Sequence, residues 1–340
     1  MHTVTALVAY NVKDQMEGTQ MSNILEKISL MGIAPVVVLD DAKKAVPLSQ
    51  AMKKGGLPCY EVTLRTPAAL DAIAAIAGQD DADMLLGAGS VITLDNCKDA
   101  LSAGAKFIVA PGFNQKVVEY CLERDVAVLP GCVTPTEIMR AMEMGLDTVK
   151  FFPANVYGGL SAMKALSGPF PRMRFIPTGG VNAANLSEYL AAPFIRAVGG
   201  SWLCAKADVN AENFDKITEL CHEARQIVLG YEVAHVGINT EDKAASLDVC
   251  RTLNDAFGLP VKEGNSSNFA SSAIEVMNNL YLGDSGHIAI KTNNIERAVA
   301  DLETKGFQLD MNTAKYKNER MVAVYLKQEI GGFAFHLLQK

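Results

Sequence analysis

The sequence has no run of apolar residues long enough to cross a bilayer. Its longest uninterrupted apolar stretch, from Ile33 to Leu39, has seven residues, whereas a membrane-spanning helix needs about 20. Residues 1–10 also carry no Lys or Arg ahead of their apolar residues, so we expect no secretory signal. A membrane is therefore not an expected partner.

Disulfide patterning and basic blocks are also missing. The seven cysteines are an odd number without a CxxC pair, which argues against a disulfide framework and a thiolate zinc site. A reducing, cytoplasmic location follows as the expectation. The net charge is −7 and no basic block stands out, so nucleic acid is not an expected partner. Any phosphate ligand would have to be held by local geometry.

What the sequence does contain is a repeated β-like segment. The 340 residues, 49% hydrophobic and 20% charged, are typical of a globular chain of about two domains. Between residues 33 and 200 the apolar segments recur every 20–25 residues, which accommodates one strand and one helix each time. These segments begin near Pro35, Tyr60, Met84, Phe107, Ala127, Val149, Arg174 and Ile195.

Helix starts lie between these segments. Thr66 precedes a proline, and Thr134-Pro-Thr-Glu137 has the pattern of a capping box. Eight strand–helix units predict a (β/α)8 TIM barrel, which we place at residues 23–229. An open doubly wound sheet is the alternative. It would need a glycine fingerprint after the first strand, and Leu39-Asp-Asp-Ala42 has none.

The pattern changes near Gly230, where an internal repeat begins. His235-Val-Gly-Ile-Asn-Thr240 is echoed by His287-Ile-Ala-Ile-Lys-Thr292, 52 residues later, and a helix-like segment follows each copy. We predict two βαβ-type modules that form a separate, smaller α+β domain at residues 231–340. Residues 1–22 fit neither domain and are predicted to be an N-terminal extension.

Two strands of the predicted barrel carry charged residues among apolar ones. In Glu61-Val-Thr-Leu-Arg65 the side chains alternate, so Glu61 and Arg65 are predicted to share the lumen-facing side, either as a structural ion pair or as part of a site. In Thr148-Val-Lys150-Phe-Phe152 the same alternation turns Lys150 and Phe152 inward. Burial disfavours the charged form of a lysine, and a neutral amine attacks carbonyls to form Schiff bases.

Glycine-rich turns follow the last two strands of the barrel. Pro177-Thr-Gly-Gly180 comes after the seventh strand and Gly199-Gly-Ser201 after the eighth. A lone Gly-Gly pair is usually only a turn. In barrels, however, the loops after strands 7 and 8 often bind phosphate through backbone N–H groups, so the sequence favours a phosphate site here.

Taken in order, these segments resemble one family over about residues 24–227. It is the family of 2-dehydro-3-deoxy-phosphogluconate (KDPG) aldolase, also called 4-hydroxy-2-oxoglutarate (KHG) aldolase. The resemblance is carried by Glu61-Val-Thr-Leu-Arg-Thr66, Gly87-Ala-Gly-Ser-Val91, Pro111-Gly112, Pro130-Gly131, Val149-Lys-Phe-Phe-Pro-Ala154, Pro177-Thr-Gly-Gly180 and Gly199-Gly-Ser-Trp202.

The resemblance implies a role for each matching residue. Lys150 would be the Schiff-base lysine and Glu61 the general acid and base. Arg65 and Ser90 would bind the pyruvate carboxylate, although the family commonly has threonine where this chain has Ser90. The phosphate would be held by Thr178, Gly179, Gly180, Gly200 and Ser201, and the pocket would be lined by Pro111 and Phe152.

The implied activity is that of a class I pyruvate aldolase. Its substrate would be a 2-keto-3-deoxy sugar acid, with or without phosphate, and the reaction would need no cofactor. The resemblance also implies a homotrimer. The sequence leaves two other functions open: a sugar-phosphate isomerase that uses Glu61 without covalent chemistry, and a protein that senses a metabolite through its C-terminal domain.

The C-terminal domain resembles the glyoxalase, or vicinal oxygen chelate, fold. In that fold, metal ligands lie at the start of the first strand and on the last strand of each module. Those positions here hold His235, Glu275, His287 and His336, a set that would suit a divalent metal such as zinc, iron, nickel or manganese. The alternative is that these histidines only pack within their strands.

Overall fold

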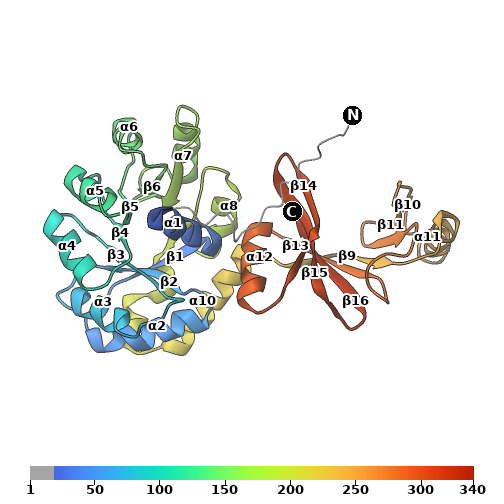
Figure 1. Ribbon diagram of the computed structural model, residues 1–340, viewed down its shortest axis with the longest axis horizontal. Helices are drawn as coiled ribbons and strands as arrows, with labels where there is room; N and C mark the ends of the chain where they lie inside the picture. Colours follow the sequence, from blue (N-terminus) through green and yellow to red (C-terminus); the bar gives the residue numbers. More distant parts are fainter. Residues whose placement is uncertain (1–18) are drawn as a thin grey trace, which may run out of the picture. The chain divides into compact units, whose positions relative to one another are not determined.

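The computed structural model describes residues 19–340, which divide into two compact units (Figure 1). The first unit ends at Arg225 and the second is Gln226–Lys340. The division falls inside α10 (Phe214–Leu229), a few residues before the boundary we predicted. Among the described residues, no helix is both long and apolar enough to cross a membrane.

Eight parallel strands form the centre of the first unit. Six of them pair in the order β5-β4-β3-β2-β1-β8, and β6 pairs with β7. Bridges from Gly131 to Lys150 and from Thr178 to Gly199 join the two sets, so the strands close into the predicted barrel. The strands are β1 (Ile33–Val37), β2 (Cys59–Thr63), β3 (Leu85–Gly89), β4 (Phe107–Val109), β5 (Ala127–Leu129), β6 (Thr148–Phe151), β7 (Arg174–Pro177) and β8 (Val198–Gly200).

A helix follows each strand of the barrel. Thr134 and Glu137 form the predicted capping box at the start of α6. The prediction that Thr66 caps a helix is wrong, because its hydroxyl donates to the Leu39 carbonyl and α3 begins only at Ala69. The helices are α2 (Ala45–Lys54), α3 (Ala69–Ala77), α4 (Leu94–Ser102), α5 (Gln115–Leu122), α6 (Pro135–Glu143), α7 (Gly159–Ser167), α8 (Leu186–Ala191), α9 (Lys206–Asn210) and α10, with short 3-10 turns η1 (Ala42–Lys44) and η2 (Ser201–Cys204).

One more helix, α1 (Gln20–Met31), precedes the first strand. Its buried residues Ile24, Leu25 and Ile28 belong to one apolar cluster with strand residues such as Phe107 and Leu129, so this helix fills the interior of the barrel from one end. The predicted N-terminal extension ends inside α1. The rest of that extension, residues 1–18, lies outside the described residues.

The second unit is one eight-stranded sheet made of two similar halves. Each half is a strand, a helix and three further strands, so it has two strands more than the predicted βαβ-type module. The first half is β9 (Glu232–Ile238), α11 (Lys243–Phe257), β10 (Val261–Lys262), β11 (Ser267–Ala270) and β12 (Ile274–Met277). The second half is β13 (His287–Thr292), α12 (Ile295–Thr304), β14 (Leu309–Lys317), β15 (Arg320–Ile330) and β16 (Phe333–Gln339).

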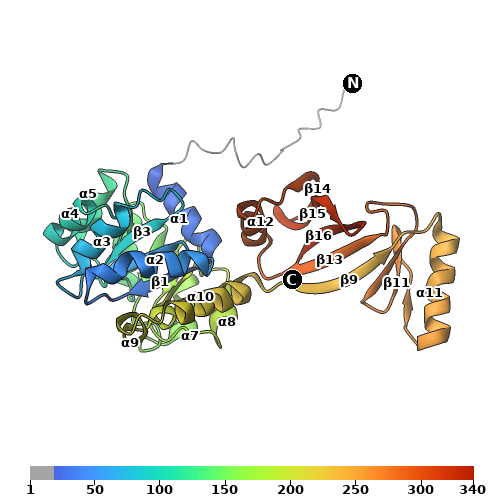
Figure 2. The ribbon, with the colours of Figure 1, turned by 90° about the horizontal axis from the view of Figure 1, so that it is seen from below.

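The two halves join through β9 and β13, which pair antiparallel in the middle of the sheet. The strand order is β10-β11-β12-β9-β13-β16-β15-β14. By the strand register both helices pack on the same face: α12 through a cluster with Val324 and Leu337, and α11 through one with Val276. Figure 2 shows α12 and α11 at opposite ends of this sheet. Because side chains alternate along a strand, the neighbouring residues of these strands lie on the face away from the helices.

Candidate active site

Lys150 and Glu61 meet inside the barrel. Lys150 lies on β6 and Glu61 on β2, and both are buried. The Lys150 Nζ lies 2.9 Å from the Glu61 Oε1. Alternation had predicted that both side chains point inward, and their contact now identifies the partner of Glu61 as Lys150 rather than Arg65. A buried charge needs such a partner.

The barrel wall fixes both members of this pair. The Lys150 backbone makes two hydrogen bonds to the segment after β5: its N–H donates to the Pro130 carbonyl, and its carbonyl accepts from the Cys132 N–H. A Cβ at Gly89 on β3 would lie 2.9 Å from the Glu61 carboxyl carbon, so the absence of a side chain there makes room for the carboxylate. In the sequence, Gly87-Ala-Gly89 is only one of the segments that carry the family resemblance, and its contact with Glu61 cannot be derived from spacing.

Phe152 and a small cavity border the pair. The Phe152 ring is half-buried, and its centroid lies 5.4 Å from the Lys150 Nζ. A cavity of about 20 Å³ adjoins Glu61, Lys150 and Thr178. Most of its other lining residues are apolar: Ile28, Ala34, Val36, Phe107, Val109, Leu129 and Ile176. The amine and carboxylate therefore face a largely apolar interior, where electrostatic interactions are stronger than in water.

Arg65 lies beside Ser90, but in a turn and not on the strand. β2 ends at Thr63, and the Arg65 side chain is exposed. The Arg65 Nε donates to the Ser90 Oγ at 2.9 Å. Ser90 itself has φ of 56°, a conformation in which a β-branched residue would be strained. The prediction that Arg65 shares the strand face of Glu61 is thus wrong, because the strand ends two residues earlier.

The turns after β7 and β8 are narrow. Gly179 and Gly180 both have positive φ, at 93° and 80°, which favours glycine. A Cβ at Gly180 would lie 2.4 Å from the Asn155 Cβ, and one at Gly199 would lie 2.2 Å from the Thr178 Oγ1. Asn155 is a neighbour of these turns that the sequence alone did not single out.

The remaining predicted residues lie around the same end of the strands. Ser201 is exposed and begins η2, directly after Gly200 on β8. The Pro111 carbonyl packs against Gly131, where a Cβ would lie only 2.1 Å from its oxygen. Gly131 is in turn the bridge partner of Lys150. The carboxyl ends of the strands, where barrel enzymes place their active sites, thus carry these residues.

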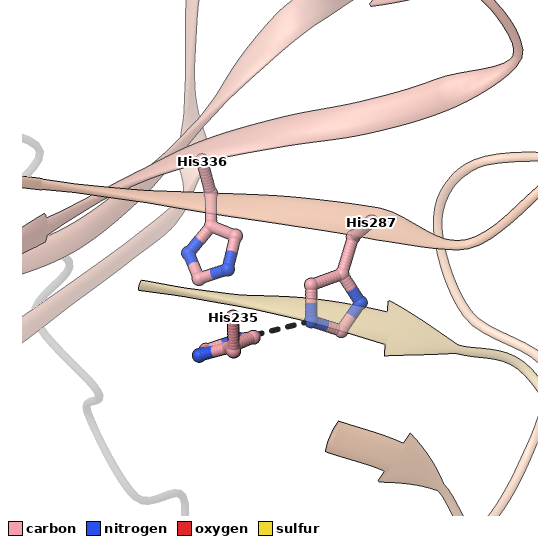
Figure 3. Close-up of side chains that lie close together, drawn as sticks. All are labelled: His235, His287 and His336. Carbon is pink, nitrogen blue, oxygen red and sulfur yellow. Dashed lines mark hydrogen bonds between the residues drawn. The ribbon is translucent and has the colours of Figure 1, made fainter. Parts of the chain in front are cut away.

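A second cluster lies in the C-terminal unit. Glu275, His235 and His287 come from the adjacent strands β12, β9 and β13, in that order. The Glu275 Oε2 lies 2.9 Å from the His235 Nε2 and 3.2 Å from the His287 Nε2. His336 on β16 completes the group: one ring nitrogen from each histidine lies within 4.8 Å of the other two. Figure 3 shows the three rings converging.

The ionisation of this cluster suits metal binding. Burial opposes ionisation of Glu275, but hydrogen bonds from His235, His287 and Ser267 hold the pKa of its carboxyl well below the usual range. Burial, and then the charges of His287 and His235, lower the pKa of His336 to about 3. At neutral pH the cluster therefore offers an anionic oxygen and a neutral imidazole, which are the forms that bind metals.

Comparisons with known proteins match the first unit. A family model described as KDPG and KHG aldolase matches residues 24–220. The 2-dehydro-3-deoxy-phosphogluconate aldolase of Treponema pallidum is 46% identical over 208 residues, which are 61% of this chain and 99% of that protein.

Two solved structures are also similar. A crystal structure of KDPG aldolase from Legionella pneumophila, with pyruvate captured as a covalent carbinolamine intermediate, is 37% identical. It covers 59% of this chain and 97% of its own, with a TM-score of 0.57. The 2-keto-3-deoxy-6-phosphogluconate aldolase of Zymomonas mobilis with 3-phosphoglycerate is 37% identical, covers 61% of this chain and 97% of its own, and has a TM-score of 0.56.

Proposed function

The chain belongs to the KDPG and KHG aldolase family, and from that premise we propose that it cleaves 2-dehydro-3-deoxy-6-phosphogluconate to pyruvate and glyceraldehyde 3-phosphate. It is a class I aldolase, which works through a Schiff base. We further propose that it cleaves 4-hydroxy-2-oxoglutarate to pyruvate and glyoxylate. The observation that carries the proposal is the buried contact between the Lys150 Nζ and the Glu61 Oε1.

The pair supplies both the nucleophile and the proton shuttle. Glu61 takes a proton from Lys150, and the neutral amine attacks the C2 ketone of the substrate. Glu61 then returns this proton to the C2 oxygen and relays a second one to it from the nitrogen of the adduct, so that the oxygen leaves as water and an iminium ion forms. Because Glu61 is again a carboxylate, directly or through water it removes the proton of the C4 hydroxyl group.

The iminium then accepts the electrons of the breaking bond. As the C4 oxygen becomes a carbonyl, the C3–C4 bond breaks and its electron pair forms an enamine on Lys150. Protonation of the enamine carbon and hydrolysis release pyruvate and restore the amine. In this scheme Arg65 and Ser90 bind the carboxylate of the substrate, because a guanidinium beside a hydroxyl offers charge-assisted donors.

The turns after β7 and β8 are proposed to bind the phosphate of the substrate. Removing the Ser201 hydroxyl by Ser201→Ala should raise KM for the phosphorylated substrate about tenfold, the usual value of a hydrogen bond to a charged group. KM for 4-hydroxy-2-oxoglutarate, which has no phosphate, should stay unchanged. Steady-state kinetics with pyruvate detection on both substrates measures this, and sulfate should compete only with the phosphorylated one. Equal effects on both substrates would place the phosphate elsewhere.

The alternative of a non-covalent isomerase is less well supported. Such an enzyme needs a carboxylate base, which Glu61 provides, but it does not require a buried amine 2.9 Å from that base. Burial disfavours the charged form of Lys150, and a reaction that uses its neutral amine accounts for a lysine at this position.

For the C-terminal unit we propose a divalent metal site with a glyoxalase-like architecture. The observations that support a fit are the orphaned ring nitrogens of His336 and the Nδ1 of His287, which are buried without a hydrogen-bond partner among the described residues. His235, Glu275, His287 and His336 would hold the ion through three imidazoles and one carboxylate. A bound ion would supply Lewis-acid character at this face of the sheet.

The aldolase activity of the first unit and the metal binding of the second are expected to be separable. All proposed aldolase residues lie before Arg225, and the Treponema relative matches 61% of this chain over 99% of its own length. A chain ending at Gly230 should therefore cleave substrate at an unchanged kcat. A chelator added to the full-length protein should leave its aldolase activity unchanged. Light scattering on this shortened chain should show the proposed homotrimer. A folded but inactive shortened chain would contradict the separation and favour a role of residues 231–340 in the aldolase.

A further inference from the structure

Three atoms of the C-terminal cluster form a compact triangle. The His235 Nε2, His287 Nε2 and Glu275 Oε2 are separated by 2.9, 3.2 and 3.3 Å. Ligand atoms at about 2.0–2.2 Å from a transition metal, at right-angled or tetrahedral positions, lie about 2.8–3.6 Å apart. These three residues are therefore already arranged around the place of one ion.

Each member of this triangle is fixed by a neighbour. The buried Ser267 hydroxyl donates to the Glu275 Oε1, so the Oε2 alone faces the histidines. The His287 ring fills the space above Gly237, where a Cβ would lie 2.0 Å from the ring. The His235 ring stands edge-on against Phe269, with centroids 5.9 Å apart. Rearranging any of the three would disturb its neighbour.

His336 is held differently. Among the described residues, neither of its ring nitrogens has a hydrogen-bond partner, although histidine ligands almost always donate their second ring N–H to an outer partner. The His287 Nδ1 shares this lack, but that ring is confined by Gly237. The His336 ring instead stacks on Tyr325, with centroids 4.5 Å apart at an interplanar angle of 20°. A stacked ring can slide over its neighbour without losing a hydrogen bond.

On the metal site proposed above, we infer that His336 is its exchangeable ligand, whereas His235, His287 and Glu275 are the fixed ones. A small anion displaces His336 from the ion and takes its place beside Tyr325. The charges favour an anionic ligand, because the charge of a divalent ion exceeds that of the single carboxylate of Glu275. Three fixed ligands and one open position are typical of catalytic sites and not of structural ones.

Cobalt binding to the full-length protein distinguishes the two kinds of histidine. Wild-type protein should bind one Co²⁺ with visible absorption bands. His336→Ala should keep the ion with affinity reduced by no more than about 100-fold, the loss expected from an outer support, and millimolar imidazole should restore its spectrum. His287→Ala, the matched control from the neighbouring strand, should show no binding at the same concentrations and no rescue. Equal losses in both variants, or no imidazole effect on His336→Ala, would overturn the inference.

A second measurement does not depend on removing a ligand. Azide added to the wild-type cobalt protein should shift the absorption bands, and Tyr325→Leu, which loses the stacked ring, should bind azide more tightly. An unchanged spectrum at saturating azide would show a closed site and contradict an exchangeable His336. A wild-type protein that takes up no cobalt would instead refute the metal site itself, while the aldolase assay reports separately on the barrel.

Discussion

Lys150→Ala is expected to abolish nearly all aldolase activity, because the covalent path has no substitute for the amine. The variant also leaves the Glu61 carboxylate buried without its partner, which typically costs about 3–5 kcal/mol. Activity should therefore be compared at a temperature where circular dichroism shows the variant to be folded. Lys164→Ala, which removes a lysine from the surface helix α7, is the matched control and should keep full activity.

Trapping the intermediate identifies the lysine directly. Borohydride added to the wild-type protein with pyruvate should reduce the imine and attach one three-carbon unit, which peptide mass spectrometry should place at Lys150. The label should be absent from Lys150→Ala. Labelling of another lysine, or none in an active wild-type protein, would sink the assignment. A non-covalent isomerase would also remain unlabelled.

Glu61→Gln is expected to lower kcat by about 10²–10⁴-fold, the usual contribution of general acid–base catalysis. Glutamine keeps the shape of the side chain and can still accept a hydrogen bond from Lys150, but it cannot shuttle protons. Substrate binding should change less than kcat, because Arg65 and the glycine turns are untouched. Steady-state kinetics with pyruvate detection gives both parameters.

The matched control for this variant is Glu137→Gln. Glu137 caps α6 and accepts from the backbone N–H groups of Val133 and Thr134. Its replacement should therefore lower thermal stability and leave kcat unchanged. If Glu61→Gln changed only KM, Glu61 would be a binding residue and the proton shuttle would have to be another group.

The periodicities of the sequence predicted much of the first unit. Strands alternate with period two, and this local rule places Lys150 and Glu61 in the lumen. The 20–25-residue spacing of the apolar segments predicted the eight strands. The rule failed where a strand ended early: β2 stops at Thr63, and Arg65 lies in the following turn. Strand ends depend on hydrogen bonds to neighbours, such as that from the Leu64 N–H to the Gly89 carbonyl, which the local pattern does not contain.

The helix starts show the same limit. Thr134 caps α6 because its partner Glu137 is three residues away, within the range of a local motif. Thr66 had a similar pattern, but its hydroxyl donates to the Leu39 carbonyl, 27 residues earlier in the chain. A competing partner from another strand is invisible to a motif of four residues.

By itself, the sequence determined the residue types and the faces on which they lie, because propensity, alternation and capping act over a few residues. Only the tertiary structure decided which of these residues meet. Lys150 and Glu61 are 89 positions apart and pair because the barrel closes, and α1 fills one end of that barrel through contacts that no spacing predicts. Likewise, His235 and His287 are 52 positions apart, and the pairing of β9 with β13 brings their Nε2 atoms to within 3.3 Å of each other.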